Sequence, residues 1–325
     1  MSTDITQPTP VNSQPAASTV RWGSVALFIL FAFAISWAIW LGLAALGVSF
    51  TIRASIGMFG PALSTVLVRL IRREGFGDAG LRLRTRGHKG AWRMYVAAYF
   101  VPPIIIALSI GFVLLVGLQH WAFGQNMQTM GAAITKALSS AGQSLPKGFT
   151  TQQLVLIDIV AQTALAFTLA IPFNMIFTFG EEFGWRGYLL PRLAPLGGIP
   201  AAIITGVVWG LWHAPLIILY GYNYPGHPWL GVGMMVVFTV ALGMIFAWLR
   251  FRSGSVWPST LAHAAINAQA GFGALLLSPA DSLLRAPIGL IGLVPMIIFA
   301  VWLAVTGRLR ADADQPAPAI KPASL

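Results

Sequence analysis

The sequence predicts an all-α protein: a polytopic transmembrane helical bundle of about eight helices. Three observations predict it, namely a hydrophobic share of 57%, a charged share of only 9% and a mean hydropathy of +0.76 over 325 residues. A soluble domain carries about 25% charged residues, so 20 basic and 9 acidic side chains are too few to cover soluble domains of this length. The composition excludes an ordinary soluble enzyme, a disordered regulator and a nucleic-acid-binding module with a charged face.

Long apolar runs recur along the chain. A helix needs about 20 residues to cross the hydrocarbon core of a bilayer. One integral membrane domain, residues 21–307, is expected between two tails, 1–20 and 308–325, whose Pro-, Ala-, Ser- and Thr-rich composition predicts disorder. In the longest loop, Met127–Ser140 predicts a short surface helix. The expected spans are Trp22–Phe50, Ile56–Ile71, Met94–Leu118, Leu154–Phe179, Pro200–Tyr220, Trp229–Leu249, Trp257–Leu277 and Pro287–Val305.

Basic residues are distributed unevenly between the loops. Eight of the 20 lie in the 25-residue stretch 69–93. With the N-terminus in the cytoplasm, the cytoplasmic segments hold 16 basic residues, and the opposite segments hold 4, namely Arg53, Lys136, Lys147 and Arg285. Because Lys and Arg resist translocation, this distribution predicts an N-in, C-in multi-pass protein of the bacterial cell membrane. Aromatic and basic residues do not alternate along this stretch, so we expect no nucleic-acid partner.

Few ionisable residues fall inside the expected spans, where each is expensive unless it is paired or wetted. Of nine acids only Asp158, Glu181 and Glu182 do so, and of five histidines only His213 and His263. We interpret Asp158, at the outer end of its span, as a structural carboxylate. The chain has no cysteine, which excludes disulfides, thiol catalysis and cysteine metal ligands.

Two adjacent glutamates lie at the predicted cytoplasmic end of the fourth span, in Gly180-Glu181-Glu182-Phe183-Gly184-Trp185-Arg186. Adjacent residues on a helix point about 100° apart, so both cannot face one cavity. Glu182 and Arg186 are four residues apart with the acid first, the favoured order for an ion pair on one face. We therefore expect Glu182 to be the orienting or structural carboxylate, and Glu181 to be the carboxylate that is free of an ion pair. The alternative is that these charges decorate a helix end at the headgroups.

Two further pairs have the same four-residue spacing. Trp209 can cover the imidazole of His213, and Pro215 disturbs the helix just beyond. His263 and Asn267 share one face of the seventh span. The alternatives are a hydrogen-bonded packing histidine and an interhelical polar pair.

One carboxylate, two histidines and one asparagine can converge from these three spans in the cytoplasmic half of the membrane. A carboxylate with a histidine holds and deprotonates a water. A second histidine with an asparagine stabilises an oxyanion. No serine or lysine is found in a nucleophile constellation, so covalent catalysis is disfavoured. These four side chains therefore predict a hydrolytic reaction.

The three motifs occur in the order of a known family. Glu181-Glu182-x-x-x-Arg186, Trp209-x-x-x-His213 and His263-x-x-x-Asn267 resemble the CAAX-processing and bacteriocin-processing (CPBP, or Abi) family of intramembrane endopeptidases, which includes the Ras-converting enzyme. The resemblance covers roughly residues 154–275, the expected catalytic core. Trp at position 209 is a mild departure, since the family often has Phe there.

The resemblance implies a CAAX-type protease in which Glu181 and His213 activate the attacking water. It likewise implies that His263 and Asn267 stabilise the tetrahedral oxyanion. Its substrate is expected to be a peptide or protein presented at the cytoplasmic membrane face, either a prenylated C-terminal peptide, a peptide precursor or a bacteriocin-related peptide. Supporting positions are Glu182, Arg186 and Trp209.

The residues leave two mechanisms open. We favour water activation by Glu181 and His213 without a cofactor, because no His-Glu-x-x-His run provides a zinc motif. In the alternative, a metalloprotease, Glu181, His213 and His263 hold a catalytic zinc with water in the fourth position.

Two other functions compete with an endopeptidase. A transporter would use the same residues as a proton or ion pathway, but the sequence shows no internal repeat, and its polar residues gather toward one side of the membrane. A non-catalytic membrane scaffold would retain the fold without the chemistry.

Overall fold

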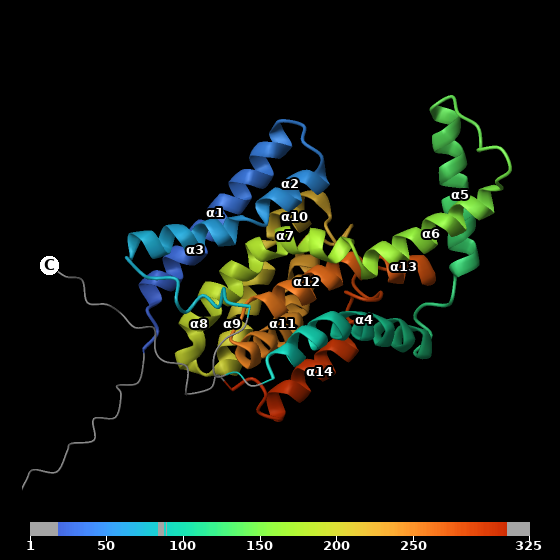
Figure 1. Ribbon diagram of the computed structural model, residues 1–325. Coiled ribbons are helices and arrows are strands. Elements are labelled where there is room, and N and C mark those ends of the chain that lie inside the picture. The colour runs from blue at the N-terminus through green and yellow to red at the C-terminus, as the bar shows by residue number, and fades with distance from the viewer. Residues whose placement is uncertain (1–18, 84–87, 89, 311–325) are drawn as a thin grey trace, which may run out of the picture.

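The computed structural model describes residues 19–83, 88 and 90–310, as helices joined by loops (Figure 1). These described residues form no β-strand, only an isolated bridge between Trp121 and Leu277, which confirms the all-α prediction. Nearly all of the two predicted disordered tails lies outside the described residues. The elements are α1 (Trp22–Ala45), α2 (Phe50–Gly57), α3 (Gly60–Ile71), α4 (Trp92–Leu115), α5 (Phe123–Ser140), α6 (Thr151–Phe167), α7 (Ala170–Gly184), η1 (Trp185–Leu189), α8 (Leu190–Leu193), η2 (Ala194–Leu196), α9 (Gly198–Trp212), α10 (Ala214–Tyr220), α11 (Pro228–Ser253), α12 (Trp257–Gln269), α13 (Phe272–Leu276) and α14 (Val294–Val305).

Several helices are long and apolar enough to cross a membrane. Within the described residues there are five, and α6 with the helical segment from α7 to η2 adds a sixth if that bent pair is one span. This confirms a polytopic helical bundle, and the protein is an integral, multi-pass membrane protein. The count of eight spans and the N-in, C-in orientation stay predictions. The five helices are Trp22–Ala45, Phe50–Ile71, Trp92–Leu115, Gly198–Tyr220 and Pro228–Ser253.

The predicted fourth span is broken in the structure. α6 ends at Phe167, Thr168 leaves helical geometry with φ −128° and ψ −99°, and the two helical segments meet at a bend of 50°. Helical structure then continues past residue 179 through η1 and α8. The motif 180–186 therefore lies inside a helical segment and is wholly buried, rather than at a helix end among the headgroups.

The last two predicted spans are shorter than their apolar sequences suggest. The seventh forms the 13-residue α12 and the 5-residue α13, and the eighth is helical only over the 12 residues of α14. Residues 277–293 between them form a compact loop rich in turns. Residues of this loop line a cavity inside the bundle.

α5 and α6 pack against each other and project from the bundle as a hairpin (Figure 1). The predicted surface helix Met127–Ser140 is confirmed, since α5 includes it. α6 begins with a capping box, in which the Thr150 hydroxyl accepts the Gln153 N–H and the Gln153 side chain accepts the Thr150 N–H. This reciprocal pair satisfies backbone donors at the helix start.

Glycines bring the central helices into close contact. A Cβ added at Gly206 of α9 would lie 2.6 Å from Cα of Val240 on α11, and one at Gly210 would lie 2.6 Å from Cα of Val236. At Gly180 of α7 an added Cβ would lie 2.6 Å from the carbonyl oxygen of Met58. Small residues spaced by four let membrane helices approach at backbone distance. This packing fixes α7, α9 and α11, which carry the candidate site or its walls.

Part of the basic stretch has a structural role that the sequence analysis did not predict. Arg69 is fully buried and pairs with Asp78 at 2.8 Å, while Arg192 pairs with Asp78 and, at 2.7 Å, with Glu74. Arg250 donates to the carbonyl oxygen of Asp78 at 2.9 Å. Burial by itself would raise the pKa of Asp78, but the two guanidinium groups outweigh it and hold that pKa below its usual value.

The glycine contact between α9 and α11 generates a stability prediction. Gly206→Ala forces the two helix backbones apart, because the new methyl group meets the Val240 backbone. We expect it to lower the free energy of unfolding by about 1–3 kcal/mol, measured as a fall in the midpoint of thermal unfolding in detergent. Gly233→Ala in α11 is the matched control, since nothing lies within 4 Å of its added Cβ. Equal midpoints for the two variants would contradict the packing argument.

Candidate active site

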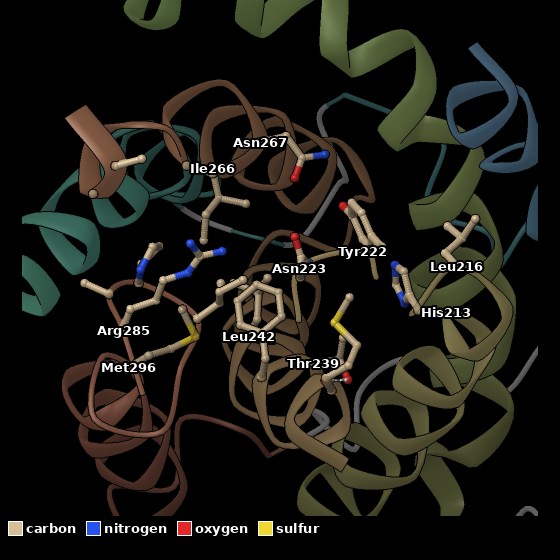
Figure 2. Close-up of a pocket in the computed structure, with 18 of the residues that line it drawn as sticks. His213, Leu216, Tyr222, Asn223, Thr239, Leu242, Ile266, Asn267, Arg285 and Met296 are labelled. Atoms are coloured by element: carbon tan, nitrogen blue, oxygen red, sulfur yellow. Dashed lines mark hydrogen bonds between the residues drawn. The ribbon is translucent and has the colours of Figure 1, made fainter. Parts of the chain in front are cut away.

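The structure places the predicted site residues around one cavity of about 410 Å³. Glu181 comes from the end of α7, His213 from the junction of α9 and α10, and His263 and Asn267 from α12. Figure 2 shows His213 and Asn267 on the wall of this cavity. The structure thus brings the four side chains together, while their catalytic roles stay predictions.

Glu181 is a buried carboxylate held by two indoles. It is 2% exposed, and its Oε2 accepts the indole N–H of Trp209 at 2.5 Å and that of Trp185 at 3.3 Å. The sequence analysis assigned Trp209 to the imidazole of His213. Their ring centroids lie 6.2 Å apart, but the polar contact of Trp209 is with Glu181. Two neutral donors fix this carboxylate without neutralising its charge.

Glu182 is buried beside Glu181 but does not line the cavity. Its Oε1 accepts from Nη1 of Arg186 at 2.9 Å, so the ion pair predicted from the four-residue spacing is present. The same oxygen lies 2.9 Å from Nδ1 of His263, a partner that the sequence analysis missed. The 100° between adjacent helical positions therefore separates the two glutamates as expected, one facing the cavity and one facing the protein interior.

Arg186 lies in the π-helical turn η1 directly after α7 and is fully buried. Its guanidinium carbon lies 4.6 Å from the ring centroid of Trp209 and 5.0 Å from that of Phe246. Its carbonyl oxygen accepts from Nε of Arg250 at 3.1 Å. Aromatic faces and one carboxylate together compensate the buried positive charge, and π-turns of this kind are frequent at functional sites.

His213 occupies the break between two helices. α9 ends at Trp212, and Pro215 sits in the first turn of α10, as the sequence predicts. The Nδ1 atom of His213 lies 2.9 Å from the carbonyl oxygen of Trp209. A carbonyl can only accept, so Nδ1 carries the proton and the neutral ring keeps a lone pair on Nε2. That tautomer suits a base.

Asn267 differs from the other three because its side chain is exposed. It shares a face of α12 with His263, which is 5% exposed and packs its ring against Trp209 at 5.2 Å between centroids. Both residues line the cavity, Asn267 with its exposed amide and His263 with a ring whose Nδ1 atom contacts Glu182.

Sequence reasoning missed other polar residues on the cavity wall, because it considered only ionisable residues inside the spans. The ring of Tyr222 stacks on that of His213, with 6.2 Å between centroids and 10° between planes.

Asn223 has a positive φ of 62°, a left-handed conformation that Asn adopts more readily than most residues. Gly221 ends α10 with a φ of 66°, so a Gly-x-Asn turn after the fifth span was the available signal. Figure 2 shows Asn223 below Asn267 and beside Tyr222. Gln119 and Arg285 were missed in the same way.

The outer part of the cavity wall comes from one end of the bundle. It includes residues that follow α4, α10 and α13, at the end where α1 finishes. The stretch 69–83 and the start of α1 lie at the opposite end (Figure 1). With the predicted N-in orientation, the cavity therefore extends toward the non-cytoplasmic side. Both the N-in orientation and the cytoplasmic presentation of the substrate stay predictions. The outer-wall residues include Gln119, Asn126, Tyr222, Asn223, Ser278 and Arg285.

The arrangement does not fit the alternative zinc site. In the part of the chain that the structure describes, no three His, Cys, Asp or Glu side chains are placed to hold a metal ion. We therefore derive no step through a metal.

Comparisons with known protein sequences match the part of this chain that carries the candidate site. Residues 159–269 match the sequence model of a family described as type II CAAX prenyl endopeptidase Rce1-like. A curated relative, CAAX prenyl protease 2 of Methanococcus maripaludis, is 31% identical over 93 residues, which cover 27% of this chain and 34% of the relative. The chain thus spans about a third of the length of the curated relative that it matches. The family match includes Glu181, His213, His263 and Asn267.

Proposed function

We propose that this chain, whose residues 159–269 match the sequence model of the Rce1-like type II CAAX prenyl endopeptidases, is an intramembrane endopeptidase that hydrolyses peptide bonds with an activated water. One observation carries the proposal: a buried carboxylate, two imidazoles and an amide from three helical segments line a single cavity. The two rings have partners that fix their Nδ1 atoms, so their Nε2 atoms are the ones available for chemistry.

The residues divide the reaction between them. Glu181 and Nε2 of His213 bind the water and take its proton as its oxygen attacks the peptide carbonyl carbon. His263 donates from Nδ1 to Glu182, and in its doubly protonated form it also donates from Nε2 to the oxyanion that forms, together with the amide of Asn267. The C–N bond then breaks, and the leaving amine takes up the proton that the water gave. Product acid and product amine account for all atoms of peptide and water.

The cavity wall supports a peptide with apolar side chains as substrate. Besides the polar set, the wall is formed largely by aliphatic and methionine side chains, among them Leu242, Ile266 and Met296 (Figure 2). A prenylated C-terminal peptide, a peptide precursor and a bacteriocin-related peptide share that character. We propose that the peptide reaches Glu181 from the end of the bundle that forms the outer wall. In the predicted N-in orientation this end lies on the non-cytoplasmic side, whereas the sequence analysis expected the peptide at the cytoplasmic face.

The assignment of Glu181 as the water-activating carboxylate generates an activity prediction. Glu181→Gln keeps the shape and the indole contacts but removes the base, so we expect kcat for cleavage of an apolar peptide to fall about 100- to 10,000-fold. Cleavage by purified protein in detergent is the measurement. Asp158→Asn is the matched control, since Asp158 is a carboxylate of α6 outside this cavity. Full activity of Glu181→Gln would refute the assignment of Glu181, whereas absence of cleavage by the wild type would leave a scaffold or a transporter.

Metal independence is a second expectation, since the mechanism above uses only side chains of this chain. We expect cleavage to survive dialysis against EDTA and treatment with 1,10-phenanthroline. Metal analysis of the active protein by mass spectrometry is the accompanying measurement. Stoichiometric zinc that leaves together with activity, and restores it when added back, would establish the alternative with Glu181, His213 and His263 as ligands.

The orientation generates a labelling prediction, which the cysteine-free chain makes straightforward. Lys136→Cys lies on α5 at the cavity end, and Arg308→Cys follows α14 at the basic end; both positions are exposed. In spheroplasts we expect a membrane-impermeant maleimide to label Lys136→Cys directly and Arg308→Cys only after permeabilisation. The reverse pattern would place the cavity end in the cytoplasm and restore cytoplasmic presentation of the substrate.

A further inference from the structure

We propose that Arg250 is a positioning residue for the candidate active site. Its guanidinium group holds the π-helical turn η1 in the register that brings Trp185 and Arg186 to the two glutamates. The inference rests on the proposed function. Arg250 lies in the last turn of α11, is 4% exposed and does not line the cavity. It therefore acts on the reaction only through the turn that it holds.

The turn η1 supplies one partner to each glutamate. The indole N–H of Trp185 donates to Oε2 of Glu181 at 3.3 Å, and Nη1 of Arg186 donates to Oε1 of Glu182 at 2.9 Å. Both donors lie at the point where α7 passes into the wider turn. Because one residue corresponds to about 100° around a helix, a change in the winding of η1 moves both donors away from the carboxylates together.

The sequence leaves one carbonyl oxygen of this turn without a backbone partner. In a π-turn an N–H bonds to the carbonyl oxygen five residues earlier, as the Leu190 N–H does with Trp185. The next carbonyl oxygen, that of Arg186, would need the N–H of Pro191, and a proline has none. Nε of Arg250 donates to that oxygen at 3.1 Å. A side chain of α11 thus takes the place of the missing backbone donor.

A second buried guanidinium group holds the following carbonyl oxygen. Nη2 of Arg69 donates to the carbonyl oxygen of Gly187 at 3.1 Å, and its Nη1 pairs with Asp78 at 2.8 Å. Nη2 of Arg250 donates to the carbonyl oxygen of the same Asp78 at 2.9 Å. A Cβ added at Gly80 would lie 2.8 Å from the guanidinium carbon of Arg250. Both arginines therefore fasten η1 to the segment that carries Asp78 and Gly80.

These contacts require the shape of an arginine side chain. A guanidinium group presents several N–H donors in one rigid plane, whereas a lysine ammonium is a compact charge. Arg250 uses Nε and Nη2 to bind carbonyl oxygens from two different segments. It forms no ion pair within the described residues, so its burial is costly. A buried cation with only carbonyl partners fits a role in fixing geometry rather than in adding stability.

Arg250→Lys keeps the charge and loses the planar donors, so it tests this role. We expect kcat for cleavage of an apolar peptide to fall about tenfold to hundredfold, because small displacements of reacting groups are expensive. KM should stay unchanged, because Arg250 does not line the cavity. Arg252→Lys is the matched control, with wild-type kcat expected: Arg252 lies in the same turn of α11, but its Nη2 donates to the carbonyl oxygen of Gly307 at 3.4 Å.

Restoring the missing N–H provides a rescue that an arginine with a merely structural role would not show. Pro191→Ala, added to Arg250→Lys, gives the carbonyl oxygen of Arg186 a backbone donor. We expect this double variant to regain most of the lost kcat. If Arg250→Lys alone does not fold, the double variant carries the comparison, and its kcat must then approach that of the wild type.

The position of Trp185 is also followed without any cleavage, by fluorine NMR of protein labelled with fluorotryptophan. Trp185→Phe identifies the resonance. We expect Arg250→Lys to shift it, Arg252→Lys to leave it in place and the added Pro191→Ala to return it. An unchanged resonance in Arg250→Lys would overturn the inference, as would an unchanged kcat or a loss that Pro191→Ala does not reduce. A shifted and rescued resonance in a protein that cleaves no peptide would reject the proposed function and keep the hold of Arg250 on η1.

Discussion

A single buried carboxylate connects the packing of the bundle to the geometry of the site. Glu182 accepts from Arg186 on its own helical segment and contacts Nδ1 of His263 on α12, both at 2.9 Å. A buried pair that loses one partner leaves an uncompensated charge, which is worth about 3–5 kcal/mol. The same contact fixes the ring of His263 on the cavity wall. Helix association and the position of a candidate oxyanion donor therefore depend on one side chain, even though that side chain does not line the cavity.

The two neighbouring glutamates have different surroundings because helix geometry separates them. Glu181 has only neutral indole donors and faces the cavity, so its carboxylate keeps the capacity to take up a proton. Glu182 meets a guanidinium and an imidazole and is committed to them. The π-turn that follows holds Trp185 and Arg186, one partner for each glutamate. An irregular turn at this place thus serves both carboxylates.

Sequence reasoning succeeded where the cause was local. The pair of Glu182 with Arg186 follows from a four-residue spacing, and the helix break at His213 follows from Pro215. It failed where partners are distant, since the contact between His263 and Glu182 joins positions 81 apart and depends on how α7 and α12 pack. Periodicity along one helix carries no information on such pairs.

Hydropathy has a similar limit. It records which residues avoid water, but not whether their backbone stays helical, so the break at Thr168 was missed and the apolar segment 287–293 was taken for helix. It also counts Arg69 as a solvated topology signal, although this side chain is buried in ion pairs. Convergence of the four site residues could still be predicted, because ionisable groups inside an apolar protein need one another or water.

The cluster of basic residues and the outer wall of the cavity lie at opposite ends of the bundle. At the basic end, Arg69, Arg192 and Arg250 bind the segment that carries Glu74 and Asp78, and the buried Arg186 lies between this cluster and the cavity. At the other end, the cavity extends from Glu181 to the loop of Arg285. In the proposed function, a peptide reaches the carboxylate from the end that carries few basic residues. If positive charges hold the basic end in the cytoplasm, as they do in most membrane proteins, the same charges determine the compartment from which the substrate comes.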